Sequence, residues 1–136
     1  MVWLNQRKTL RSILSRCLST SFCTLGWALR KLGRYDAGLA TFQKSAELGD
    51  AAGPGGTNTD TRNEMAICLM ELGDLKGARR ELERALQEEP ENIKIISNLG
   101  VLAMKAGNKS EAAAFFRTAL ELDPADPLAA HFLGEL

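Results

Sequence analysis

The residues that most often perform catalysis or bind metals are few in this sequence and stand apart from one another. His131 is the only histidine, and it lies in an apolar stretch beside Phe132. A histidine in such a setting is more often a packing residue than a ligand or a general base. The three cysteines, Cys17, Cys23 and Cys68, lack the closely spaced ligand pairs of a zinc site. We therefore predict no metal centre.

The acidic residues around position 90 are adjacent only in the sequence. Glu88, Glu89 and Glu91 flank Pro90, where a helix is expected to end and carboxylates are solvated. The sequence contains neither a Gly-rich phosphate loop nor a nucleophile elbow. We predict a protein that is not an enzyme and uses no cofactor, unless it is the regulatory part of a larger enzyme.

The formal net charge is zero, but the charges are divided unequally along the chain. Residues 1–35 contain seven Lys or Arg and no acid, whereas residues 36–136 contain ten bases and seventeen acids. The acidic larger part argues against nucleic-acid binding. The odd number of cysteines favours a reducing compartment. The sequence contains no run of eighteen apolar residues, so we predict no membrane-spanning helix. We expect a cytoplasmic protein.

Residues of the same size class recur at the same spacing in three stretches. Starting at Leu99, steps of eight, five, four, three and five reach Gly107, Ala112, Phe116, Ala119 and Pro124. The same steps from Met65 reach Gly73, Ala78, Leu82, Ala85 and Pro90, and from Leu25 they reach Gly33, Gly38, Phe42, Ser45 and Asp50. The copies begin 40 and then 34 residues apart, and only the final Pro is lost in the first.

Each copy has the pattern of two helices joined by a short turn. In the third copy, apolar residues from Ile96 to Ala103 share one helical face, and those from Ala112 to Leu120 share another, with Gly107 between them. Pro124 is expected to end the second helix. Neither helix can bury its apolar face alone, so the copies must stack.

The stretches LGWALRKLGRYDAGLATFQKSAEL, MAICLMELGDLKGARRELERALQEEP and LGVLAMKAGNKSEAAAFFRTALELDP resemble the tetratricopeptide repeat. That repeat is a 34-residue helix–turn–helix unit with Leu-Gly, Ala, Phe and Pro at set intervals. Arg62, at the place of an opening aromatic, and Ala103, at the place of another, depart from the pattern. The resemblance covers residues 19–124, and it implies an all-α, right-handed superhelical solenoid with a truncated fourth repeat.

The predicted organisation follows from this register. Repeats are expected at 19–50, 59–92 and 93–126, with a Gly/Pro-rich loop at 51–58 and a partial fourth repeat or C-terminal cap at 127–136. Asp60 or Thr61 is expected to cap the helix that follows the loop. In the last helix, Leu128, Phe132 and Leu136 form an apolar contact surface for repeat 3, for a partner or for self-association.

The resemblance also implies where a partner binds. In this family the stacked first helices line a concave groove that holds a peptide or a helix of another protein. The positions expected on this groove combine an apolar stripe with charged rims. They are Trp27, Arg30, Lys31, Ile67, Met70, Lys94, Asn98, Val101, Met104 and Lys105. Ile67 and Val101 are equally compatible with packing between helices.

One subclass of the family grips the C-terminal carboxylate of chaperones with Lys and Asn side chains. Lys94 and Asn98 suit that role, but Cys23, Trp27 and Glu64 stand at the matching places of the first two copies. The set is incomplete and includes a carboxylate. We therefore predict an apolar or amphipathic helical ligand rather than a chaperone tail.

Residues 1–18 fit no copy of the repeat and have the pattern of a basic amphipathic helix. Three interpretations remain open. The segment is a cap that packs its apolar face against Phe22 and Leu25, or a mitochondrial transit segment, or a helix that binds an anionic membrane or an acidic partner. Ser19 or Ser21 is a possible start of a new helix, which would make the segment separable.

Overall fold

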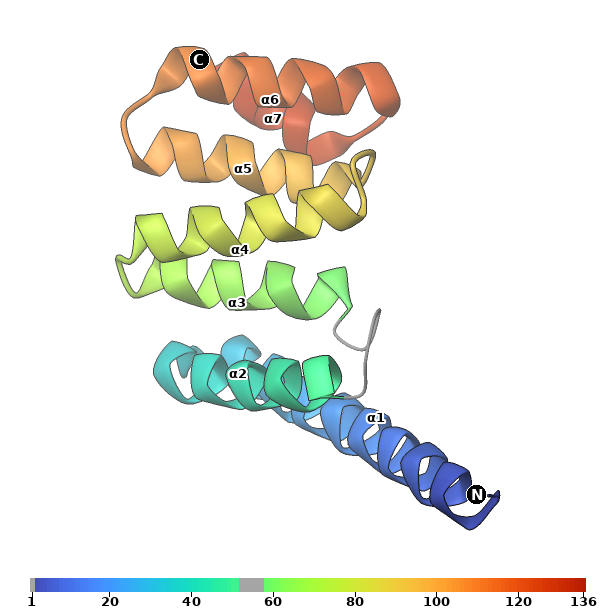
Figure 1. Ribbon diagram of the computed structural model, residues 1–136. Coiled ribbons are helices and arrows are strands. Elements are labelled where there is room, and N and C mark those ends of the chain that lie inside the picture. Colours follow the sequence, from blue (N-terminus) through green and yellow to red (C-terminus); the bar gives the residue numbers. More distant parts are fainter. Residues whose placement is uncertain (1, 52–57) are drawn as a thin grey trace.

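The computed structural model describes residues 2–51 and 58–136, and all regular secondary structure in these ranges is helical. The helices form antiparallel pairs that stack in one column, with α1 at one end and α6 and α7 at the other (Figure 1). The predicted all-α solenoid is confirmed. The helices are α1 (Val2–Lys31), α2 (Tyr35–Ala51), α3 (Thr59–Glu71), α4 (Leu75–Glu88), α5 (Ile93–Lys105), α6 (Lys109–Leu122) and α7 (Pro127–Glu135).

The same glycine turn joins the two helices of each pair. Gly33, Gly73 and Gly107 have φ angles of 78°, 89° and 82°, in the left-handed region that residues with a side chain rarely adopt. In the second turn, the Asp74 N–H donates to the carbonyl of Leu69 at 2.9 Å, which closes the end of α3. These glycines therefore mark the place where each first helix ends.

Small residues in the first helices make room for aromatic rings from the second. A Cβ atom on Gly100 would lie 2.6 Å from the ring of Phe116, and one on Gly26 would lie 2.9 Å from the ring of Phe42. Both rings are fully buried. The recurrent small and large residues of the sequence pattern are therefore the two sides of the same helix–helix contact.

Arg62 shows how the structure accommodates a departure from the repeat pattern. Its side chain is buried, yet it lies within 3.5 Å of carboxylate oxygens from three acidic residues. Asp50 comes from α2, whereas Glu81 and Glu88 come from α4. A buried cation is tolerated only when opposite charges surround it. An electrostatic contact between α2, α3 and α4 thus replaces the usual aromatic.

The segment 1–18 is not separated from repeat 1 by a helix boundary. Helix α1 runs without a break from Val2 to Lys31, so the prediction that Ser19 or Ser21 begins a new helix is wrong. Ser21 Oγ donates to the carbonyl of Cys17, four residues back, which satisfies the hydroxyl inside a continuous helix. Ser19 instead points at α2, where its Oγ lies 2.8 Å from the carbonyl oxygen of Ser45.

The apolar face of the first turns of α1 is not covered by the rest of the molecule. Leu10, Ile13 and Leu14 are more than half exposed, and so is Leu25, against which they were expected to pack. These turns project beyond α2 at the end of the stack (Figure 1). The expected packing of this face against Leu25 is therefore not seen, and the role of residues 1–18 stays a prediction. None of the described helices is both long enough and apolar enough to cross a membrane.

The start of α3 differs from the prediction. Asn58 is the N-cap, and its Oδ1 accepts a hydrogen bond from the Thr61 N–H at 2.7 Å, so Asp60 and Thr61 lie in the first turn and not at the cap. The preceding residues 52–57, the centre of the predicted loop, lie outside the described part of the chain, and the loop stays a prediction.

At the other end of the chain, Phe132 of α7 stacks on Phe116, with ring centroids 5.5 Å apart. The ring therefore belongs to the packing of α7 on repeat 3. Leu128 and Leu136 of the same apolar set are each 39% exposed, and their role as a contact for a partner or a second copy stays a prediction.

Candidate functional site: the groove of the first helices

The inner faces of the first helices enclose a hollow at the N-terminal end of the stack. Its volume is about 600 Å³, and its walls come from α1, from the start of α3 and from one residue of α5. Hydroxyl, amide and charged groups outnumber apolar ones. The lining residues are Arg16, Ser19, Thr20, Cys23, Thr24, Trp27, Asn58, Asp60, Thr61, Glu64 and Lys94.

Trp27 is the largest apolar side chain of this hollow. Half of its surface is exposed, and the Lys31 ammonium lies 5.3 Å from the centre of its ring. A cation this close to an indole ring is attracted by the ring's electron density. Trp27 therefore places a half-exposed aromatic surface at the hollow, and its role in binding a partner stays a prediction.

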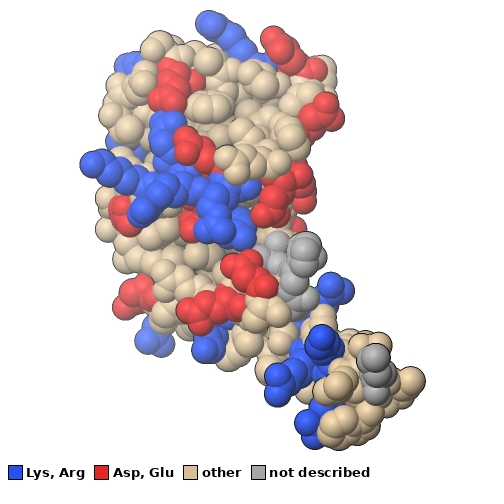
Figure 2. Space-filling model, viewed as in Figure 1, with Lys and Arg blue, Asp and Glu red and all other residues tan. Residues whose placement is uncertain are grey.

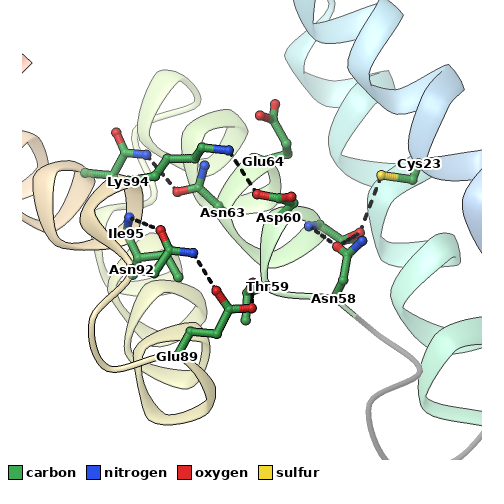
Figure 3. A network of polar contacts seen from close by, with 12 residues as sticks. Cys23, Asn58, Thr59, Asp60, Asn63, Glu64, Glu89, Asn92, Lys94 and Ile95 are labelled. Atoms are coloured by element: carbon green, nitrogen blue, oxygen red, sulfur yellow. Dashed lines mark hydrogen bonds and ion pairs between the residues drawn. The ribbon is translucent and has the colours of Figure 1, made fainter. Parts of the chain in front are cut away.

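Helices α1 and α3 are joined across the hollow by small polar side chains. The Thr61 hydroxyl lies 2.9 Å from Asn58 Oδ1 and 3.4 Å from Cys23 Sγ (Figure 3). Asn58 thus serves both as the helix cap and as a wall of the hollow. This contact fixes the distance between the two helices that form the site.

Three of the four cations of the predicted groove form ion pairs within the protein. Lys94 Nζ lies 3.0 Å from Asp60 Oδ1 (Figure 3), and Lys105 Nζ lies 3.7 Å from Glu71 Oε1. Each pair joins equivalent positions of neighbouring repeats, 34 residues apart. The Arg30 guanidinium also forms an ion pair with Glu64, although these two residues are not at equivalent positions of repeats 1 and 2.

Asn98, the other predicted polar ligand residue, is also engaged. Its Nδ2 donates to Asn63 Oδ1 at 2.7 Å, and Asn63 is buried. Together with the ion pairs, this bond ties α3 to α5 along the groove. The walls of the groove are therefore cross-linked by their own side chains.

A second network holds the start of α5 in place behind Lys94. Glu89 accepts hydrogen bonds from the Thr59 hydroxyl at 2.6 Å and from the Asn92 amide at 2.7 Å (Figure 3). The hydrogen bond from Thr59, followed by that from Asn92, lowers the pKa of the Glu89 carboxyl below its usual range. The ionised carboxylate thereby links the start of α3 to the turn before α5.

The apolar stripe predicted along the groove is less exposed than the sequence suggested. Met70 is only 6% exposed and packs in the core cluster that contains Leu82 and Leu99, so it does not form a groove surface. Ile67 and Val101 are half-buried against the same cluster. Met104 is half-buried against the next one. Among the apolar residues predicted on the groove, Trp27 is therefore the most exposed.

Several lining residues were missed by the sequence analysis. They are Arg16, Ser19, Thr20, Thr24, Asn58, Asp60 and Thr61. Arg16, Ser19, Thr20 and Thr24 precede Trp27 in α1 at helical spacing. This periodicity is the sequence signal that places them on the same side of the helix as Trp27. Extending the groove by one and two turns before each Leu-Gly step would have found them.

The buried thiol near the groove is chemically inert. Burial raises the pKa of Cys68 to about 11, so the thiol stays protonated at neutral pH and is a poor nucleophile. Among residues 2–51 and 58–136, no three side chains of the metal-binding types come together.

Comparison with known proteins places the chain in a family. Two sequence profiles described as tetratricopeptide repeat match it, one over residues 69–136, which is half of the chain, and one over residues 19–48. The chain belongs to the tetratricopeptide repeat family. A stretch of 67 residues is 37% identical to the CTR9 homolog of Arabidopsis thaliana. This match covers 49% of the chain but only 6% of the plant protein.

Solved tetratricopeptide repeat (TPR) domains share the fold. The TPR domain of Arabidopsis OM64 superposes with a TM-score of 0.80 at 21% identity, covering 89% of this chain and 95% of that domain. The first TPR domain of Spaghetti (RPAP3), bound to the HSP90 peptide SRMEEVD, gives 0.75 at 20% identity over 87% and 89%. The second TPR domain of human RPAP3, in complex with the HSP70 peptide SGPTIEEVD, gives 0.74 at 17% identity over 91% and 96%.

Proposed function

We propose that this TPR protein is a non-catalytic scaffold that binds a segment of a partner protein in the groove of α1, α3 and α5. The observation that carries the proposal is Trp27, which is half exposed at the rim of a hollow of about 600 Å³. A rigid aromatic side chain beside a concave polar surface is typical of the anchor of a binding site. Similar domains that hold peptides support the same use of this fold.

The paired charges favour a ligand without a terminal carboxylate. A carboxylate that approached Lys94 would compete with Asp60, and it would also meet the negative charge of Glu64. The peptides in the two similar RPAP3 domains end in Glu-Glu-Val-Asp. We propose that the groove instead accepts an internal segment that places an apolar side chain on Trp27 and neutral polar groups on the hydroxyl-lined wall.

A displayed library of random peptides tests this proposal. Peptides selected on the wild-type protein are labelled, and their affinities are measured by fluorescence polarisation for the wild type, Trp27→Ala and Leu122→Ala. We expect Trp27→Ala to weaken binding by about tenfold or more, since aromatic anchors carry much of the binding energy. Leu122, which is 42% exposed at the end of α6, is the matched control and should change nothing. Equal affinity of the wild type and a folded Trp27→Ala would overturn the proposal.

The ligand class is tested separately with the two acidic peptides of the similar domains, SRMEEVD and SGPTIEEVD. Weak or absent binding to the wild type is expected. In Asp60→Asn, the Lys94 ammonium loses its partner and becomes available to a ligand carboxylate, so affinity should rise. Tight binding of the acidic peptides to the wild type would contradict the proposed ligand class, though not the use of the groove.

A further inference from the structure

Six large apolar side chains lie at helical spacing along one outer face of α1 and the residue after it. At about 100° per residue, they fall within a sector of about 80°. Each is between 50% and 76% exposed. They are Trp3, Leu10, Leu14, Leu18 and Leu25 of α1 and Leu32, which directly follows the helix and keeps its hydrogen bond to the carbonyl of Ala28, and we call them the α1 stripe. An exposed apolar surface of this length on a folded protein indicates a contact surface.

The other repeats show what this face does inside the stack. Leu25 occupies the same repeat position as Met65 and Leu99, which are 6% and 1% exposed. Met65 packs in the cluster formed with α2, and Leu99 packs in the cluster formed with α4. No described helix occupies the corresponding place beside Leu25. The α1 stripe therefore lies on the helix face that is buried in repeats 2 and 3 but exposed in repeat 1.

Every charged residue of α1 is basic. Residues 1–35 contain seven Lys or Arg and no acid, whereas residues 36–136 carry seven more acids than bases. Figure 2 shows the projecting end of α1 with basic and uncharged side chains, while acidic side chains appear over the rest of the stack. Arg7 lies within the stripe, and its guanidinium carbon is 4.0 Å from the centre of the Trp3 ring.

We propose that the α1 stripe docks on an anionic lipid membrane, with α1 lying in the plane of the interface. A helix with an apolar face, flanking Lys and Arg and a Trp suits the boundary between headgroups and acyl chains. The positive charges on α1 are attracted to anionic headgroups, and the acidic remainder of the chain is repelled from them. The charge division therefore favours a single orientation.

The length of the stripe favours a surface over a single partner helix. From Trp3 to Leu32 the stripe spans about 44 Å at 1.5 Å per residue. The second helices that cover this face elsewhere have 17 and 14 residues and are therefore about 21–26 Å long. A helix of that kind would leave about half of the α1 stripe in water, whereas a lipid surface covers all of it.

Docking on this side leaves the groove open. The buried residues of α1, Ser19 and Gly26, lie about 120–140° around the helix from the centre of the stripe. Cys23 and Trp27, which line the groove, lie about 140–180° away. A membrane on the outer face of α1 would therefore leave room for a peptide in the groove.

Co-sedimentation with phospholipid vesicles tests the proposal on the whole chain. The probes are vesicles of phosphatidylcholine alone and of phosphatidylcholine mixed with phosphatidylglycerol. We expect binding to the mixed vesicles that weakens with salt. Arg7→Gln/Arg11→Gln should lower the partition coefficient about fivefold for each charge removed. Leu10→Ser/Leu14→Ser should lower it at least tenfold, because both side chains are already exposed and their loss removes only membrane contact.

Matched controls keep the test decisive. Leu122→Ser removes a similarly exposed leucine, and Lys76→Gln/Lys109→Gln removes two exposed charges outside α1. Both should bind vesicles as the wild type does, and circular dichroism checks that every variant is folded. The proposal is overturned if the wild type ignores the mixed vesicles, or if the Leu10→Ser/Leu14→Ser variant binds them equally well. Capture of an acidic amphipathic peptide by α1 without vesicle binding would likewise overturn it, in favour of a protein partner.

Discussion

Repeat 1 and repeat 3 have the same helix pair and the same glycine turn, yet they bury equivalent residues very differently. Leu25 is 51% exposed in repeat 1, and Leu99 is 1% exposed in repeat 3. Trp27 is half exposed, whereas Val101 at the same position is half-buried between two clusters. The repeat pattern specifies each helix pair, and the place of the pair in the stack decides which apolar residues remain for binding.

The largest expected effect tests that contrast directly. Leu99→Ala should lower the free energy of unfolding by about 2–5 kcal/mol, because it leaves a cavity in a packed cluster. Leu25→Ala should lower it by less than about 1 kcal/mol, since an exposed leucine loses little burial. Urea denaturation followed by circular dichroism measures both. Similar losses for the two variants would show that Leu25 is covered in solution.

Overfilling a close helix contact should have the next largest effect. Ala112 is fully buried where α6 packs on α5, so Ala112→Leu should cost about 1–3 kcal/mol of stability. Ala78→Leu, at the equivalent place in repeat 2, should behave alike. Ala114→Leu changes an exposed residue of the same helix and should be almost neutral. If Ala112→Leu and Ala114→Leu denature alike, the register of repeat 3 is wrong.

The ion pair between the second helices of repeats 2 and 3 should contribute less. Arg79 and Glu111 lie 2.9 Å apart with about a third of each side chain exposed, and the hydrogen bond that Arg79 donates to Glu111 raises the pKa of the guanidinium. A double-mutant cycle with Arg79→Ala and Glu111→Ala should give a coupling of about 0.2–1 kcal/mol. The coupling should shrink as salt is added. A coupling that salt leaves unchanged would argue against an exposed ion pair.

The smallest effect concerns pH. The pKa of Glu89 is lowered in the folded protein, so its contribution to stability is present above its usual pKa of about 4.5 and is lost as pH falls through the lower folded value. Thr59→Val removes the first hydrogen bond that lowers this pKa. The wild type should therefore lose slightly more stability than Thr59→Val on acidification from about pH 5 to pH 3. Parallel acid-denaturation curves would show that the Thr59 bond is not formed in solution.

The fold was predictable because the repeat pattern is redundant. Glycines, small residues and large residues occur at fixed steps in three copies, so a departure such as Arg62 does not obscure the register. The continuous α1 was not predicted, because Ser19 and Ser21 are typical helix caps and only the position of α2 shows that Ser19 is a contact residue. Helix-cap propensity is a property of the serine alone, whereas the role of Ser19 depends on its contact with Ser45 of α2.

The site was predicted only in part for a related reason. Trp27 was found because it follows Gly26 on the groove side of a recognisable step. Met70, one helical turn beyond the equivalent position Ile67, was assigned to the groove. Its side chain instead packs in the core cluster that includes Leu82 of α4. The pairing of Lys94 with Asp60 depends on the distance between two repeats, which a single sequence does not give.

The most direct test of the central claim is site-specific photo-crosslinking at Trp27. A benzophenone amino acid is placed at position 27, or at the exposed Gln87 of α4 as a control, and each protein is irradiated with a peptide selected on the wild type. We predict crosslinks from position 27 and none from position 87, since the peptide occupies the groove of α1, α3 and α5. Equal crosslinking from both positions, or crosslinking from position 87 alone, would contradict the assignment of partner binding to this groove.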